Sequence, residues 1–267
     1  MMSSMASVSW YTHNTFYLCV CVCVCVCVCE CVCVHVVCML CAHTQGACGS
    51  SWAFSTTGST EGQHFKKTGN LVSLSEQDLI DCNQKEADRG CGGGFMDHGF
   101  KYIIENHDID TEESYPYTAK AGTCRFKESH VGATLTSYKD MLPRKSESAL
   151  QEAVASVGPV SIAIDASSTY FRYYKHGVLI DSKCTNAYPN HAALVVGYGV
   201  EEEQDYWLVK NTWSTSWGDN VAKEGSTNHF SSRHMKRYAG PEPEAMYGRG
   251  RAALNRVALS SRMMEST

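Results

Sequence analysis

The hydrophobic pattern of the chain changes from a helical period to a period of two, and this change constrains the fold most. Helices are expected at 51–67, from Ser75, at about 95–106 and at 147–156. Strands are expected at 160–164, 191–199 and 206–213. The fold class is therefore α+β, divided near residue 140 into a helical half and a β half. A site is expected in the cleft between the two halves.

Cysteine usage separates the first 43 residues from the rest of the chain. Of the 15 cysteines, ten lie within residues 19–41, where Cys alternates with Val. Residues 16–42 are apolar except for Glu30 and His35, so they inflate the hydrophobic content of 43%. A simple dinucleotide repeat reads as Cys-Val in one frame. We therefore interpret residues 1–43 as translated non-coding sequence that lies outside the fold.

Two functional alternatives for this stretch stay open. A membrane span needs about 20 apolar residues, but Glu30 and His35 interrupt the run, and a charge at that depth is costly. Alternating Cys-Val places every sulfur on one face of a strand, whereas structural zinc sites fold their ligands around one ion. A secretory signal peptide is not recognisable either, since the first Lys or Arg is Lys66.

The charge pattern argues against a nucleic-acid partner. The formal net charge is −5, and Lys and Arg form no run that could neutralise a phosphate backbone. The residues that point to chemistry require neither a cofactor nor a metal, so none is expected.

The segment Gln45-Gly-Ala-Cys48-Gly-Ser-Ser51-Trp is the most informative stretch of the chain. It resembles the sequence around the nucleophile of papain-like cysteine peptidases, with Ser51 where that family has cysteine. His191 lies 140 residues after Ser51, and Asn211 lies beyond it, in the order and range that the family uses.

Other landmarks of the same family recur in order. The run Asn190-His-Ala before an apolar strand is similar to the family's histidine strand, and Tyr206-Trp-Leu-Val-Lys-Asn-Thr-Trp to its asparagine strand, although Ser214 replaces the usual glycine. Gly90-Cys-Gly-Gly-Gly resembles the glycine-rich wall of its cleft. The resemblance is to cathepsin L-like members and covers about 44–220.

The resemblance implies a papain-like, two-lobed α+β fold. A helical lobe is expected at about 44–140 and an antiparallel, β-barrel-like lobe at about 141–220, with the cleft between them. Residues 221–267 are expected to be a divergent tail without the closing strands of the family. The fold is therefore expected to be incomplete at both ends, and an exposed sheet edge would invite pairing with other chains.

The resemblance also assigns catalytic roles. Ser51 takes the nucleophile position, His191 is the site histidine, Asn211 orients its imidazole, and Gln45 supplies an oxyanion-hole N–H. In the family, the helix N-terminus and an imidazolium make the cysteine a thiolate. An aliphatic hydroxyl is about as weak an acid as water, with a pKa far above 7, so peptide-bond hydrolysis is expected to be impaired. The alternative is a serine-using hydrolase on the same scaffold, as in silicatein-like relatives.

Substrate contacts and disulfides follow from the same resemblance. An extended peptide is the expected ligand, and residues that would contact it are Gly93, Gly94, Phe95, Met96, Ala163 and Asn190. Cys48 is expected to pair with Cys91 and Cys82 with Cys124, while Cys184 lacks its family partner. Disulfides imply an oxidising compartment, lysosomal or extracellular.

Overall fold

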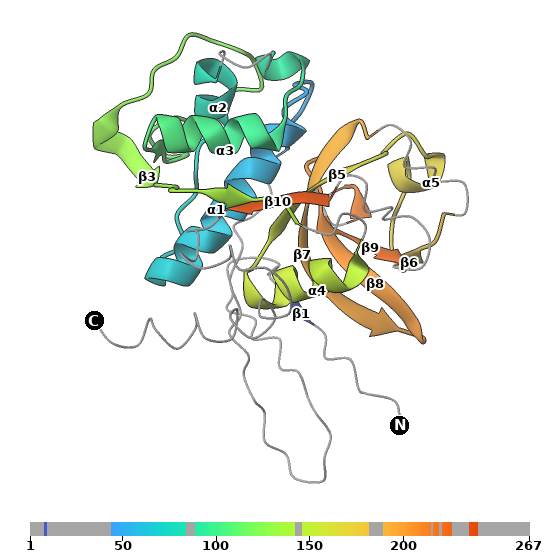
Figure 1. Ribbon diagram of the computed structural model, residues 1–267. Coiled ribbons are helices and arrows are strands. Elements are labelled where there is room, and N and C mark those ends of the chain that lie inside the picture. The colour runs from blue at the N-terminus through green and yellow to red at the C-terminus, as the bar shows by residue number, and fades with distance from the viewer. Residues whose placement is uncertain are drawn as a thin grey trace, which may run out of the picture.

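The structure is a computed structural model with two lobes (Figure 1). Helices gather in one lobe and the long strands in the other, as the α+β expectation requires. The residues that the structure describes are 8–9, 44–83, 89–141, 146–181, 189–214, 216–218, 221–225 and 235–239.

The helical lobe is built on three helices that share one apolar core. These are α1 (Ser51–Thr68), α2 (Glu76–Cys82) and α3 (Met96–Glu105). Two 3-10 turns, η1 (Gly90–Gly92) and η2 (Glu128–His130), and a small antiparallel pair, β2 (Ile109–Asp110) with β3 (Val131–Ala133), complete the lobe. Side chains from all three helices meet in the core, among them Trp52, Leu79 and Phe100.

Local capping explains where these helices begin and end. The Ser75 hydroxyl accepts the N–H of Asp78 at 2.9 Å and so caps α2, as the sequence predicts. Leu74, before the cap, and Leu79, inside the helix, are placed as in a hydrophobic staple, and both are fully buried. Helix α1 ends at Gly69, whose φ of 74° is the left-handed conformation that favours glycine.

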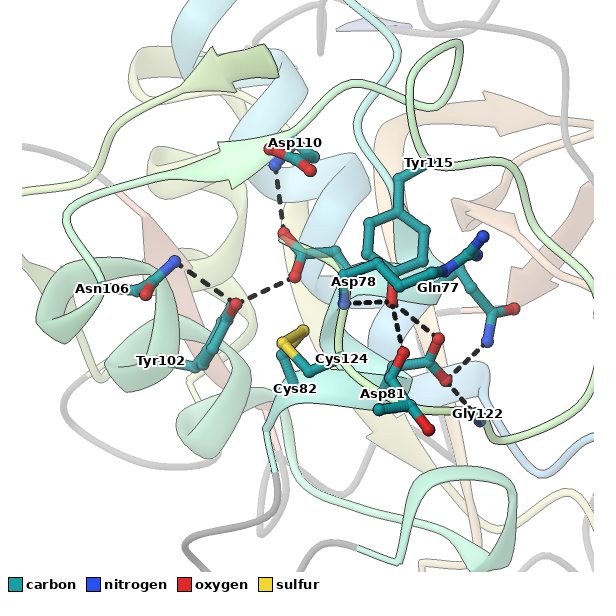
Figure 2. Close-up of a disulfide and its surroundings, with 12 residues drawn as sticks. Gln77, Asp78, Asp81, Cys82, Tyr102, Asn106, Asp110, Tyr115, Gly122 and Cys124 are labelled. Atoms are coloured by element: carbon teal, nitrogen blue, oxygen red, sulfur yellow. Dashed lines mark hydrogen bonds between the residues drawn. A yellow bond between two sulfur atoms is a disulfide. The ribbon is translucent and has the colours of Figure 1, made fainter. Parts of the chain in front are cut away.

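A polar network surrounds the disulfide between Cys82 and Cys124 (Figure 2). Asp81, next to the disulfide, accepts hydrogen bonds from the Tyr115 hydroxyl at 2.7 Å and from the backbone N–H of Gly122 at 2.6 Å. This network ties the loop that carries Cys124 to α2. The loop has little regular structure, so the disulfide and these bonds fix its course across the lobe.

The β lobe is one mostly antiparallel sheet. Its order is β4 (Tyr138–Lys139), β10 (Met235–Ala239), β5 (Val160–Ile164), β7 (His191–Glu201), β8 (Gln204–Lys210), β9 (Val221–Gly225) and β6 (Val178–Leu179). Only the pairing of β6 with β9 is parallel among the described strands. Helices α4 (Glu147–Ser156) and α5 (Thr169–Arg172) accompany this sheet.

Two expectations about the ends of the chain differ from the structure. Strand β9 pairs with β8 and strand β10 pairs with both β4 and β5, so the tail at 221–267 contributes strands that the sequence analysis did not foresee. Strand β1 (Val8–Ser9), inside the segment expected to lie outside the fold, pairs with β7. Sheet pairing is decided by the partner strand, which local sequence does not reveal.

Candidate active site

Helix α1 places Ser51 at its first residue, facing the start of β7. The Ser51 hydroxyl accepts the backbone N–H of Ala192 at 3.2 Å. The loop before the helix is fixed by the disulfide between Cys48 and Cys91 and by a 2.8 Å hydrogen bond from the N–H of Gly49 to the Cys91 carbonyl. A Cβ at Gly49 would lie 2.7 Å from that carbonyl oxygen, so only glycine fits there.

His191 opens β7 and is joined to Asn211, the residue after β8. Ring atom Nε2 of His191 lies 2.7 Å from Oδ1 of Asn211, and the backbone N–H of Thr212 donates to the same Oδ1 at 2.7 Å. Two hydrogen bonds to Oδ1 identify it as the amide oxygen, so Nε2 carries the proton and Nδ1 is left as the acceptor of the neutral ring.

Burial decides the charge of His191. The side chain is 8% exposed, and Asn211 is fully buried. Burial lowers the pKa of His191 below its ordinary value, and the hydrogen bond to Asn211 opposes this shift without reversing it. The imidazole is therefore neutral at pH 7. A neutral ring with a free Nδ1 is suited to accept a proton.

Gln45 is held in place by the segment that follows Asn211. Its backbone N–H donates to the Thr212 carbonyl at 2.9 Å, and the Thr212 hydroxyl donates to its Oε1. Its Nε2 donates to the Cys48 carbonyl at 2.8 Å, which leaves the second N–H of the amide for another acceptor. Tyr117 supports this arrangement, since its hydroxyl donates to the Gln45 carbonyl at 2.8 Å.

A cavity of about 530 Å³ opens to solvent beside His191, and we call it the His191 cavity. The Trp213 ring lies against the imidazole, with ring centroids 4.9 Å apart and planes 42° apart. The residues that line the cavity are Ala166, Arg172, Tyr173, Asn190, His191 and Trp213.

The residues expected to contact a peptide differ in their exposure. Met96 is buried in the core of the helical lobe, whereas Phe95 is 62% exposed and its ring packs edge-on against His98. Asn190 lines the His191 cavity, where its Oδ1 accepts the N–H of Ala166 at 3.0 Å. The expected peptide contacts of these residues therefore stay predictions.

The other expected contacts lie beside the segments that carry Ser51 and His191. Gly93, with a φ of 108°, and Gly94 follow the disulfide-bonded turn at Cys91, and both are half-buried. Ala163 is paired with Ala192 across β5 and β7, next to the strand residue that binds Ser51.

Sequence reasoning missed several residues of the site. Thr212 and Tyr117 hold Gln45, and Arg172, Tyr173 and Trp213 line the His191 cavity. Thr212 and Trp213 directly follow Asn211, so their position in the chain was the available signal. Tyr117 and Arg172 lie in loops or a short helix, where no local pattern indicates their contacts.

Cys184 and residues 16–42 lie outside the described residues. Within the part of the chain that the structure describes, no group of three or more His, Cys, Asp or Glu side chains is placed to hold a metal ion. No helix in that part is long and apolar enough to cross a membrane. The membrane and metal hypotheses, which depend on residues 16–42, therefore remain predictions.

Comparison with known proteins gives one consistent result. The family model for papain family cysteine proteases matches residues 37–233. A cathepsin L-like peptidase of Aedes aegypti is 56% identical over 176 residues, which are 66% of this chain and 52% of that protein. Cathepsin L1 of Drosophila melanogaster is 54% identical over 66% of this chain and 47% of that protein. The chain thus spans about half the length of the curated relatives it matches.

Solved structures agree with the sequence comparison. Digestive procathepsin L 3 of the Tenebrio molitor larval midgut superimposes with a TM-score of 0.72 at 40% identity, over 76% of this chain and 67% of that one. Digestive procathepsin L2 from the same tissue gives a TM-score of 0.71 at 38% identity, over 76% and 65%. These similarities bear out the expected papain-like fold.

Proposed function

The chain belongs to the papain family of cysteine proteases, and from this we propose that it is a cathepsin L-like, peptide-binding domain with impaired hydrolysis. The observation that supports this proposal is the arrangement of residues around His191. Ser51, at the nucleophile position by resemblance, contacts the strand residue next to His191, and Asn211 orients the imidazole. The positions that the family uses for catalysis are thus close together. Residue 51, however, carries a hydroxyl oxygen where the family has a thiol sulfur.

The chemistry of oxygen accounts for the impairment. A cysteine at the start of α1 would form a thiolate with His191, because the helix N-terminus and an imidazolium both stabilise the anion. The Ser51 hydroxyl, whose ordinary pKa lies far above 7, stays neutral even where a helix N-terminus and an imidazolium favour its anion. Within the described part of the chain, no hydrogen bond joins Ser51 Oγ to His191. Peptide-bond hydrolysis is therefore expected to be far below that of a cysteine enzyme.

A serine-using hydrolase is the second candidate, and the protonation of His191 favours it. A neutral imidazole whose Nε2 proton is held by Asn211 is the form that can take a proton from an attacking hydroxyl through Nδ1. The backbone N–H of residue 51 and the free N–H of Gln45 would stabilise the oxyanion. Under this proposal the unmodified chain hydrolyses an activated ester and loses that activity in His191→Ala.

The site of action is part of the proposal. The two disulfides, Cys48–Cys91 and Cys82–Cys124, form and persist in oxidising compartments. We therefore place the protein in the lysosome or outside the cell. The expected ligand is an extended peptide lying along Gly93 and Gly94.

Replacing one atom tests the leading proposal. The Ser51→Cys chain should cleave a fluorogenic peptide and be inactivated by a thiol-directed inhibitor, whereas the unmodified chain should do neither. Ser51→Cys combined with His191→Ala is the matched control, and it should lose the gained activity. A well-folded Ser51→Cys chain without peptidase activity would contradict the proposal that the rest of the site is intact.

A further inference from the structure

The His191 cavity carries a positive charge. Among the described residues that line it, Arg172 is the side chain with a formal charge at pH 7, since His191 is neutral. The guanidinium makes one long contact, from Nε to the Ala166 carbonyl at 3.5 Å. No carboxylate in the described part of the chain lies within ion-pair distance of it. Its two terminal NH₂ groups are therefore available to a ligand.

A neighbouring carboxylate, Asp165, does not neutralise this charge by direct contact. Its Oδ1 accepts the backbone N–H of Ser167 at 3.0 Å, the Ser167 hydroxyl at 2.5 Å and the Asn190 amide at 3.3 Å. These donors come from its own turn and from the wall of the cavity. Asp165 thus orders the Asn190 side chain, while Arg172 stays unpaired at the opening.

The fold holds Arg172 at a fixed place. It ends α5, and the residue before it, Phe171, is buried with its ring 4.9 Å from the Trp217 ring. The Trp217 indole N–H donates to the Phe171 carbonyl at 2.8 Å. Because α5 is anchored through Phe171, the neighbouring Arg172 and Tyr173 are exposed toward solvent and the cavity. The backbone of Arg172 is thus held at the edge of the cavity, and the planar guanidinium at the end of its side chain offers donors in a defined fork.

We propose that the His191 cavity binds a carboxylate of the bound peptide through Arg172. Arginine presents a planar fork of donors that matches a carboxylate, and the Tyr173 and Trp213 rings offer apolar surface beside it. The carboxylate is either an acidic side chain or the free C-terminus of the peptide. This inference rests on the proposed function, because it names a feature of the peptide that the same site selects.

Matched peptides test the inference by binding alone. The probes are fluorescein-labelled eight-residue peptides that differ by Asp or Asn at one position, scanned along the peptide, each with a C-terminal acid or amide. Fluorescence anisotropy with the full chain gives each Kd. The Asp peptide should bind roughly three- to tenfold tighter than the Asn peptide at one position if a side chain is selected. The acid should bind tighter than the amide if the C-terminus is selected.

Substitutions of Arg172 test whether this residue causes the preference for a peptide carboxylate. The preference for the carboxylate should vanish in Arg172→Gln, persist in part in Arg172→Lys, and reverse toward the Asn or amide peptide in Arg172→Glu. Lys175→Gln is the matched control, because Lys175 lies three residues on and its Nζ donates to the Ser216 carbonyl. A preference that survives Arg172→Gln, or no preference at any position, would overturn the inference. Equal binding of all peptides leaves the proposed function standing, whereas no binding of any peptide contradicts both.

Discussion

Ser161 in β5 donates a hydrogen bond from its hydroxyl to the backbone carbonyl of Ser55 in α1, at 2.7 Å. The Ser55 hydroxyl in turn donates to the Ala193 carbonyl in β7 at 2.7 Å. Both serines are buried. One turn of α1 is thus fixed to two strands of the sheet, and that turn directly follows Ser51. The distance between Ser51 and the His191 strand depends on this buried contact.

Removing the Ser55 hydroxyl should therefore weaken the joint between the lobes. Ser55→Ala is expected to lower the free energy of unfolding by about 1–2 kcal/mol, since a buried hydrogen bond is lost. Chemical denaturation measures this change. Ser156→Ala removes an exposed hydroxyl that bonds within α4 and should change stability by less than about 0.5 kcal/mol. Equal effects of the two substitutions would contradict the special role of Ser55.

Asn211 should control the reactivity of a cysteine placed at position 51. In the Ser51→Cys chain, Asn211→Ala removes the acceptor of the His191 Nε2 proton, so the imidazolium that stabilises the thiolate forms less readily. The pKa of the introduced thiol should rise. Alkylation of residue 51 by iodoacetamide, followed against pH by peptide mass spectrometry, measures it. Resolution by peptide is needed because ten cysteines lie within residues 19–41. An unchanged pH profile would rule out an orienting role.

Ser214 adopts a backbone conformation that favours glycine. Its φ is 80°, and the papain family has glycine at this position by the resemblance noted in the sequence. Ser214→Gly should stabilise the fold by up to about 1 kcal/mol, reduced by loss of the 2.7 Å hydrogen bond to the Ser216 hydroxyl. Thermal unfolding measures the gain. Ser216→Gly is the control: its φ is not positive, so the same change should destabilise.

Regular elements with local signals were predictable from the sequence. Helix α4 begins and ends at the expected residues, because Ser146 caps it and Gly158-Pro159 stops it. Strand β5 occupies the expected residues, but its burial does not alternate, because Ser161 is buried like its apolar neighbours. The glycine that ends α1 and the serine that caps α2 are also local signals, because each depends only on residues next to it in the sequence.

Elements that depend on distant partners were not predictable. Strand β10 exists because β4 and β5 both pair with it, and its own sequence resembles a charged loop. In β9, Glu224 takes an inward position where an apolar residue is expected. Within the site, the resemblance indicated Ser51, His191 and Asn211, but it did not indicate the direction of the Asn190 side chain, which lines the His191 cavity. That direction is set by the Ala166 backbone, which only the fold brings near.

Acidic pH should stabilise the protein through Glu224. This carboxyl is buried in β9, and burial, with a smaller contribution from the nearby charge of Asp181, raises its pKa to about 8. The unfolded value lies near 4.5, so between pH 4.5 and 8 the folded state holds a proton that the unfolded state releases. The free energy of unfolding should therefore fall as pH rises across this range, by on the order of a few kcal/mol. Below pH 4.5 the effect is absent.

Glu224→Gln should flatten this dependence, because the amide cannot ionise. Urea unfolding at pH 5 and pH 8 gives the comparison, with the variant gaining stability mainly at pH 8. Some dependence of the free energy of unfolding on pH should remain, since burial also raises the pKa of Glu76 to about 8. Glu113→Gln, at an exposed carboxylate, is the matched control and should leave the slope unchanged. If Glu224→Gln changed stability equally at both pH values, the carboxyl would not hold a proton in the folded state, and β9 would be more open to water than its burial indicates.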